Sequence, residues 1–144
     1  MSSDETVKAT WSSVFRRKGG SGAYLRLWDE QGDATRDAAL MGVVLELGEL
    51  PVLCASGGKG SRFVLTTRHL ICGDRKVPIS SVIGVRPPDL STTRKRDLNE
   101  LAVETSGGEH VTVESEPGGP YSGLWNVLLH ISRHNARKSD RRRD

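Results

Sequence analysis

Cysteines, aromatic residues and long apolar runs are all scarce in this chain of 144 residues. Its two cysteines, Cys54 and Cys72, lie inside short apolar runs, so we expect buried thiols and no disulfide framework. No run approaches the roughly 18 apolar residues that a membrane-spanning helix needs, and the opening residues lack the apolar core of a signal peptide. The sequence therefore predicts a protein of the reducing cytoplasm.

Motifs for catalysis and metal binding are missing or incomplete. The segment that contains Gly58 and Lys59 lacks the first glycine and the final Ser or Thr of a phosphate-binding loop, and no Gly-x-Ser-x-Gly elbow occurs. His130 and His134 have the spacing that can place two imidazoles on one metal ion, but no third or fourth ligand is evident. We therefore predict a protein that is not an enzyme, with no metal and no cofactor.

The length of the chain suits one domain with poorly ordered terminal segments. We divide the chain into an N-terminal extension over residues 1–47, a domain over residues 48–136 and a basic tail over residues 137–144. The last twelve residues contain six basic and two acidic side chains. Such a tail can attract phosphates of nucleic acid or an anionic membrane, although a disordered, solubilising end has the same composition.

The sequence of the N-terminal extension is consistent with more than one local structure. Residues 1–22 end in a glycine-rich segment, so we expect weak order apart from packing of Trp11 or Phe15. Residues 23–28 alternate as in a strand, but a short helix is also consistent with them.

A helix is predicted over residues 34–46, where apolar side chains recur at helical spacing between a capping Asp33 and a terminating Gly48. The competing interpretation is a strand over residues 43–47, because Gly42 weakens the helix.

From residue 51 onward the chain predicts strands separated by glycine- and proline-containing turns. Apolar and polar residues alternate along these runs, which is typical of sheets with a buried face. The seven predicted strands span residues 52–56, 62–67, 69–73, 76–79, 82–86, 98–105 and 110–115.

The last element is an amphipathic helix over residues 121–136, with Pro120 in its first turn. Its apolar face carries Trp125, which we expect to plug an open end of the sheets. Its polar face carries His130, Arg133, His134 and Arg137, among others.

Seven strands followed by one helix resemble the pleckstrin-homology (PH) superfold. The residues along the predicted strands are similar to those of its bacterial PH-like and GRAM-like branches. The resemblance covers residues 48–136 and implies an α+β, mainly β fold: a seven-stranded, partly open barrel capped by the C-terminal amphipathic helix. Its matching segments are Gly60, 63–66, Arg68, Leu70, 77–79 and 82–83.

The resemblance also implies an anion site, because PH-like proteins that bind inositol phosphates use basic residues around one loop. The corresponding residues here are Lys59, Arg62, Arg75 and Lys76. Val64 stands where the second basic residue of the family's strand pair would be, so the pattern is incomplete.

We therefore predict a non-catalytic binding module that mediates protein–protein interaction or self-assembly through edge strands. The alternative is recognition of anionic phospholipid headgroups at the membrane periphery. Nucleic-acid binding through the tail ranks third, because aromatic residues for base stacking are scarce.

Overall fold

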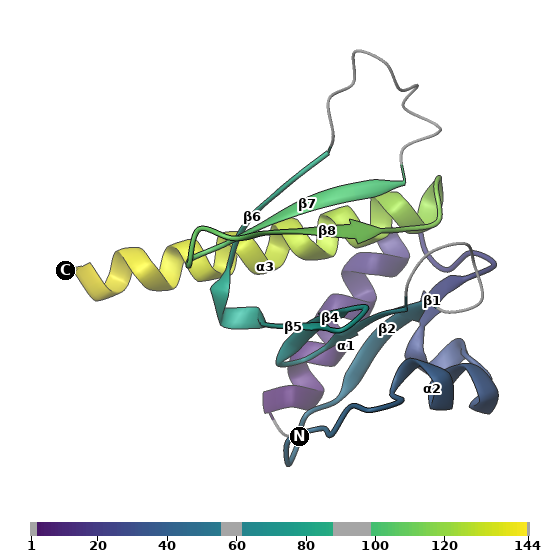
Figure 1. Ribbon diagram of the computed structural model, residues 1–144. Helices are drawn as coiled ribbons and strands as arrows, with labels where there is room; N and C mark the ends of the chain where they lie inside the picture. The colour runs from purple at the N-terminus through teal and green to yellow at the C-terminus, as the bar shows by residue number, and fades with distance from the viewer. Residues whose placement is uncertain (1–2, 56–61, 88–98, 144) are drawn as a thin grey trace.

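Two antiparallel sheets and a long C-terminal helix make up the protein (Figure 1). The computed structural model describes residues 3–55, 62–87 and 99–143, with side chains up to residue 138. Its helices are α1 (Ser3–Arg17), α2 (Asp33–Ala39) and α3 (Gly119–Arg143), with short 3-10 turns η1 (Trp28–Glu30) and η2 (Ile79–Ser81). Its strands are β1 (Leu25–Leu27), β2 (Pro51–Ala55), β3 (Phe63–Thr66), β4 (His69–Cys72), β5 (Arg75–Pro78), β6 (Val82–Arg86), β7 (Glu100–Thr105) and β8 (His110–Glu114).

The larger sheet, β1-β2-β3-β4-β5, is covered on both faces. A row of paired residues, Leu53, Leu65, Leu70 and Val77, lies in the main core. The neighbouring row, Cys54, Val64 and Ile71, packs with Ala39 of α2 and with Trp28. Because neighbouring strand residues point to opposite faces, this double covering explains why β3 is buried along its whole length.

The smaller sheet, β6-β7-β8, has one buried face. Leu101 and Val103 of β7 alternate with more exposed residues, as do Val111 and Val113 of β8. Helix α3 packs across β6 and contributes Leu124, Val127, Leu128 and Ile131 to the main core. The amphipathic pattern of the C-terminal segment thus reflects its docking on this sheet.

Helix α1 lies against α3 and β2 and completes the main core with Trp11, Val14 and Phe15. The two helices approach closely because Gly123 has no side chain: a Cβ there would lie 2.7 Å from the Phe15 ring. The backbone just after α1 also approaches the start of α3 closely, since a Cβ on Gly19 would lie 1.9 Å from the Gly119 carbonyl oxygen.

The sequence-based expectations hold for the α+β class and for the positions of the seven predicted strands, and differ elsewhere. Residues 3–17 form a helix where weak order was predicted, although the predicted packing of Trp11 and Phe15 is confirmed. Of the two interpretations for residues 23–28, the strand is confirmed over Leu25–Leu27. The carboxylate of Glu116 anchors it by accepting hydrogen bonds from the backbone of Ala23, Tyr24 and Leu25.

Two helix lengths also differ from the predictions. The helix predicted over residues 34–46 ends at Ala39, and Gly42 has a φ of +74°, which helical residues do not adopt. Helix α3 extends beyond residue 136 into the segment predicted as a tail. Trp125 packs against the core but stays half-buried, so it is not the plug that we expected.

The described strands form two separate hydrogen-bonded sheets and do not close into a barrel. None of the helices in the described residues is both long and apolar enough to cross a bilayer.

Candidate anion-binding groove

The structure describes three of the four basic residues predicted to form one anion site, and two of these three, Arg62 and Arg75, are engaged in other contacts. Lys59 lies outside the described residues. Arg62 is occupied by backbone: its Nε donates to the Gly73 carbonyl at 3.1 Å, and its Nη1 donates to the carbonyls of Ala39 and Met41. Arg62 therefore fastens the end of α2 to the sheet.

Arg75 and Lys76 point to opposite faces of β5. Arg75 pairs in register with Cys72, and Lys76 pairs with Ile71. Arg75 is also neutralised, because its Nη2 lies 2.6 Å from a carboxylate oxygen of Glu109. Arg62 and Arg75 are therefore engaged by backbone carbonyls and by a carboxylate. Lys76 lies on the face of the sheet that carries Val64 and Ile71.

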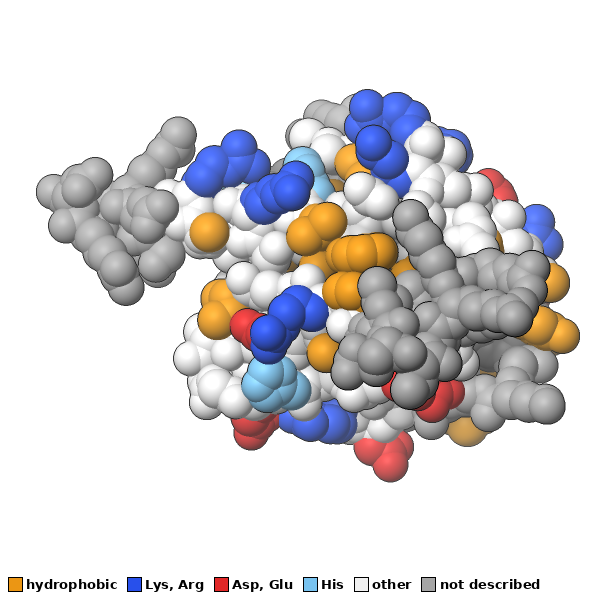
Figure 2. Space-filling view, turned by 90° about the horizontal axis from the view of Figure 1, so that it is seen from above, with side chains coloured by type: hydrophobic (Ala, Val, Ile, Leu, Met, Phe, Trp, Pro, Cys, Tyr) orange, Lys and Arg blue, Asp and Glu red, His pale blue; other side chains and the backbone are white. Residues whose placement is uncertain are grey.

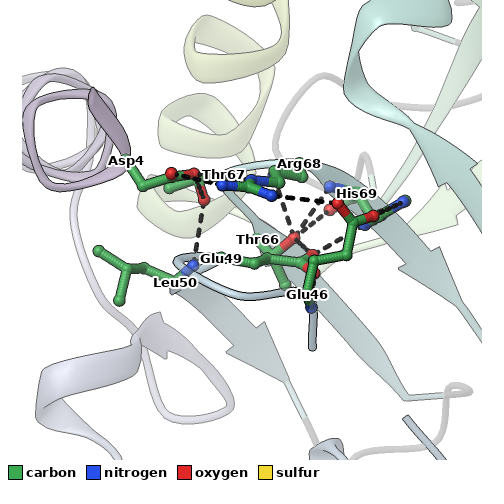
Figure 3. A network of polar contacts seen from close by, with 8 residues as sticks. All are labelled: Asp4, Glu46, Glu49, Leu50, Thr66, Thr67, Arg68 and His69. Carbon is green, nitrogen blue, oxygen red and sulfur yellow. Dashed lines mark hydrogen bonds and ion pairs between the residues drawn. The ribbon is translucent and has the colours of Figure 1, made fainter. Parts of the chain in front are cut away.

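A network of paired charges lies where the β3–β4 turn meets α1 and the segment before β2 (Figure 3). Arg68 donates to both carboxylate oxygens of Asp4, at 3.2 and 2.9 Å, and to Glu46 at 3.1 Å. Thr67 donates to Asp4 at 2.6 Å and accepts from the backbone of Leu50. The guanidinium of Arg68 is the main reason that the pKa of Asp4 lies below its usual range.

Glu49 is the buried centre of this network, with its side chain 0% exposed. Its carboxylate accepts hydrogen bonds from Thr66 Oγ1 and from the backbone N–H of Glu46, and lies 2.8 Å from His69 Nδ1. Burial acts to raise the pKa of Glu49, but these hydrogen bonds outweigh it and hold the pKa below its usual value.

Glu46, Glu49 and His69 also have the composition of a metal site, with ligand atoms within 4.8 Å of one another. Their ligand atoms are already engaged with each other, and Arg68 lies against Glu46. A positively charged guanidinium beside a carboxylate opposes cation binding, so we interpret the network as a structural lock between α1 and the sheet. In the part of the chain that the structure describes, neither His130 nor His134 belongs to such a cluster.

A groove of about 570 Å³ runs between the end of α1 and the outer side of α3. Four of its lining residues are basic and exposed: Arg17 and Lys18 from the end of α1, and Arg133 and Arg137 from α3. Apolar side chains of Val14, Leu129 and Ala136 also line it. Figure 2 looks onto this side of the protein, where basic side chains lie along the projecting part of α3 and at the upper edge, with apolar side chains between.

The groove gathers four positive charges that are not neutralised by carboxylates among the described residues. Within the described residues, no carboxylate pairs with any of these four side chains. By contrast, ion pairs with carboxylates engage Lys8, Arg26, Arg68, Arg75 and Arg86. Cations at the end of α1 interact favourably with the helix dipole, but Arg133 and Arg137 lie within α3 and have no such role.

The chemistry that this groove can offer is attraction and hydrogen bonding. Guanidinium groups donate in a planar fork that suits phosphate and carboxylate oxygens, and the apolar residues can cover a ligand's nonpolar part. The two thiols of the chain lie elsewhere, and burial raises the pKa of Cys54 to about 11 and that of Cys72 to about 12. Both are therefore neutral near pH 7 and poor nucleophiles.

Sequence reasoning missed this groove because it missed α1. A signal for that helix was present: Val7, Trp11, Val14 and Phe15 recur at helical spacing, behind acidic Asp4 and before basic Arg17. Comparison with protein-family models, curated proteins and solved structures gave no match.

Proposed function

We propose that this protein is a non-catalytic binding module that recognises anionic phospholipid membranes through the α1–α3 groove. The observation that carries the proposal is the set of four exposed basic side chains that line one groove without carboxylate partners in the described residues. Each basic residue near an anionic membrane surface contributes about 1 kcal/mol of attraction. The protein would then be cytoplasmic and associate peripherally with the membrane.

The proposal includes a PH-like arrangement of the domain. Strands β2–β5 and β6–β8 form two consecutive antiparallel meanders, followed by a helix that packs on the second, and this order supports it. The binding surface would be unusual for such an arrangement, because α1 precedes the PH-like strands and supplies one wall of the groove.

Vesicle sedimentation at about 0.1 M salt tests the function. We expect binding to vesicles that contain phosphatidylglycerol and none to pure phosphatidylcholine. The double substitution Arg133→Glu/Arg137→Glu should weaken binding at least about thirtyfold, which corresponds to about 1 kcal/mol for each reversed residue. Equal sedimentation with neutral and anionic vesicles would contradict the proposal.

A matched control is Lys76→Glu, which makes the same change in charge as each single groove substitution, at an exposed residue of β5 outside the groove. We expect less than about a threefold effect on binding, because salt screens charges beyond about 10 Å. A truncation that lacks residues 138–144 separates the groove from the tail. If this truncation abolishes binding, or if single-stranded nucleic acid competes better than vesicles, the groove is not the membrane site.

A second candidate function is protein association, and a different surface favours it. Met41, Val44 and Leu47 are 71%, 84% and 97% exposed on the segment between α2 and β2. Arg62 and Glu49 anchor this segment at its two ends, so it presents apolar side chains from a fixed backbone. Self-association through these residues would match the prediction of a homo-oligomer.

Sedimentation velocity over a range of concentrations tests this second function. We expect a concentration-dependent dimer that the substitutions Met41→Ser and Leu47→Ser weaken, while vesicle binding stays unchanged. A constant monomer mass at every concentration would exclude self-association.

A further inference from the structure

His130 occupies the junction of two hollows on the α1–α3 seam. It lines the basic groove together with Arg17 and Arg133, and it also lines a neighbouring pocket of about 160 Å³. That pocket is bounded by Val7, Trp11, Ile79 and Ile131, with polar groups from Thr6, Thr10, His134 and Asn135. The imidazole is half-buried, whereas the four basic side chains of the groove are exposed.

The ionisable groups that share these two hollows with His130 are all bases. Helix α1 supplies Arg17 and Lys18, and α3 supplies Arg133, His134 and Arg137. The 3-10 turn η2 supplies only the apolar Ile79. Burial is the main cause that lowers the pKa of His130, and the neighbouring His134 and Arg137 lower it further. In the free protein the imidazole is therefore neutral near pH 7.

Charge complementarity indicates which anions suit this arrangement. A phosphodiester carries one negative charge, whereas a phosphate monoester carries about −1.5 to −2 at pH 7 and has three terminal oxygens that accept hydrogen bonds. A single phosphodiester would leave most of the four permanent positive charges of the groove without a negative partner. A monoester can engage cations from both walls and one further donor.

We propose that the groove selects phosphate monoesters over phosphodiesters at the membrane surface, and that His130 is a ligand-contacting residue of this site. The inference depends on the proposed membrane function and narrows it to one class of headgroup. An anion beside the imidazole favours the protonated form, so binding raises the pKa of His130 and takes up a proton. By linkage, the contribution of His130 to affinity grows as the pH falls from about 8 to about 6.5.

The test compares two kinds of vesicle that have equal total surface charge, one with phosphatidic acid and one with phosphatidylglycerol. We expect the wild-type protein to bind the monoester vesicles about tenfold more tightly near pH 7, which is the effect of one additional charge-assisted hydrogen bond. Equal binding to both would overturn the inference on headgroup class and leave the membrane function intact. Binding to neither would overturn the membrane function itself.

The role of His130 is tested with His130→Gln, and His134→Gln serves as the matched control one helical turn away. We expect His130→Gln to remove most of the preference for phosphatidic acid at about pH 6.5 and to change little at about pH 8. Comparing variants at each pH also corrects for the titration of the lipid. An unchanged preference in His130→Gln, or an equal loss in His134→Gln, would overturn the assignment.

Two further measurements test the proposal without a substitution. The first distinguishes a soluble phosphate ester from a membrane lipid, and the second checks the contact between His130 and the phosphate. Soluble glycerol phosphate should compete only weakly with vesicles, and competition at equal phosphate concentration would point to a soluble ester and overturn the membrane source. The His130 ring signals in a nuclear magnetic resonance pH titration should report a pKa that rises when short-chain phosphatidic acid is added. A His130 pKa that is unchanged at saturation would contradict the contact.

Discussion

The two charged regions along α1 show opposite uses of the same residue types. At the start of the helix, Asp4 meets Arg68 in a network in which each carboxylate contacts either Arg68 or the His69 imidazole. At its end, Arg17 and Lys18 face Arg133 and Arg137 across a groove without carboxylates among the lining residues. Paired charges lower each other's exposure to water and hold elements together, whereas unpaired charges stay available to a ligand.

The difference shows that basic residue types alone do not identify a binding site. Arg62 and Arg75 were predicted as anion ligands from the sequence, yet Arg62 donates to backbone carbonyls and Arg75 pairs with Glu109. Arg68 is likewise engaged by Asp4 and Glu46. Among the described residues, Arg133 and Arg137 have no such partners, and Arg17 donates one hydrogen bond to the carbonyl of Ser13 at 3.4 Å. The structure therefore divides the basic residues of the chain into structural and available groups.

The strongest test compares a charge reversal in the network with a charge reversal in the groove. We expect Arg68→Glu to lower the melting temperature markedly, because it places a carboxylate against Asp4 and Glu46. Refolded or stabilised Arg68→Glu protein should still bind anionic vesicles. Arg133→Glu should do the reverse and weaken binding about fivefold or more at an unchanged melting temperature, since it removes about 1 kcal/mol of attraction. Loss of both properties in both variants would mean that the two regions are not separate.

A second test removes the buried centre of the network. Glu49→Ala removes the carboxylate that engages the His69 imidazole and the backbone N–H of Glu46. It also removes one acceptor of Thr66 Oγ1, which keeps the His69 carbonyl at 3.2 Å. Each buried group that loses its partner destabilises a fold by about 1–3 kcal/mol, so we expect at least that loss in chemical denaturation. Glu114→Ala is a suitable control, because Glu114 is an exposed carboxylate of β8. A destabilisation no larger than in this control would contradict the lock.

Acid should weaken the network before it affects the groove. The pKa values of Asp4 and Glu49 are lower in the folded protein than their ordinary values of 3.8 and 4.5. Groups with a depressed folded pKa stabilise the protein above their unfolded pKa, and this stabilisation is lost as the pH falls through the folded pKa. Stability should therefore decline as the pH drops below about 4.5, with less decline in Glu49→Gln. Denaturation midpoints that do not depend on pH in this window would contradict the assignment.

Gly123 tests whether the groove depends on close helix packing. An added Cβ would lie 2.7 Å from the Phe15 ring, so Gly123→Ala must move α1 away from α3. Overpacking of this kind destabilises proteins by about 1–3 kcal/mol. We expect a lower melting temperature and weaker vesicle binding together, because the groove has one wall on each helix. As a control, Gly107→Ala lies in open space and should change neither property.

The strands could be predicted from the sequence because their signal is local. Leu101 and Val103 of β7, like Val111 and Val113 of β8, alternate with more exposed residues at the period of two that a pleated strand places on one buried face. The length of α2 could not be predicted in the same way, because the segment after Ala39 is held by tertiary contacts of Arg62 and Glu49. These contacts join residues about 20 positions apart, so no local pattern reveals them.

The groove could not be predicted from the sequence for a related reason. Its two walls come from opposite ends of the chain, and only the docking of α1 on α3 brings Lys18 and Arg133 to one site. The sequence did indicate that Arg133 and Arg137 share the polar face of the last helix. It could not show that a second helix supplies the other half of the charge.

The smallest expected effect comes from Arg75, which the sequence favoured as a ligand contact. Its ion pair with Glu109 joins two exposed side chains of neighbouring hairpins. Exposed pairs of this kind contribute about 0–1 kcal/mol, so Arg75→Ala should shift the melting temperature by no more than a few degrees. Vesicle binding should also stay within about threefold of wild type, since screening isolates this position from the groove. If Arg75→Ala instead weakened binding as much as Arg133→Glu, the PH-like loops and not the α1–α3 groove would be the anion site.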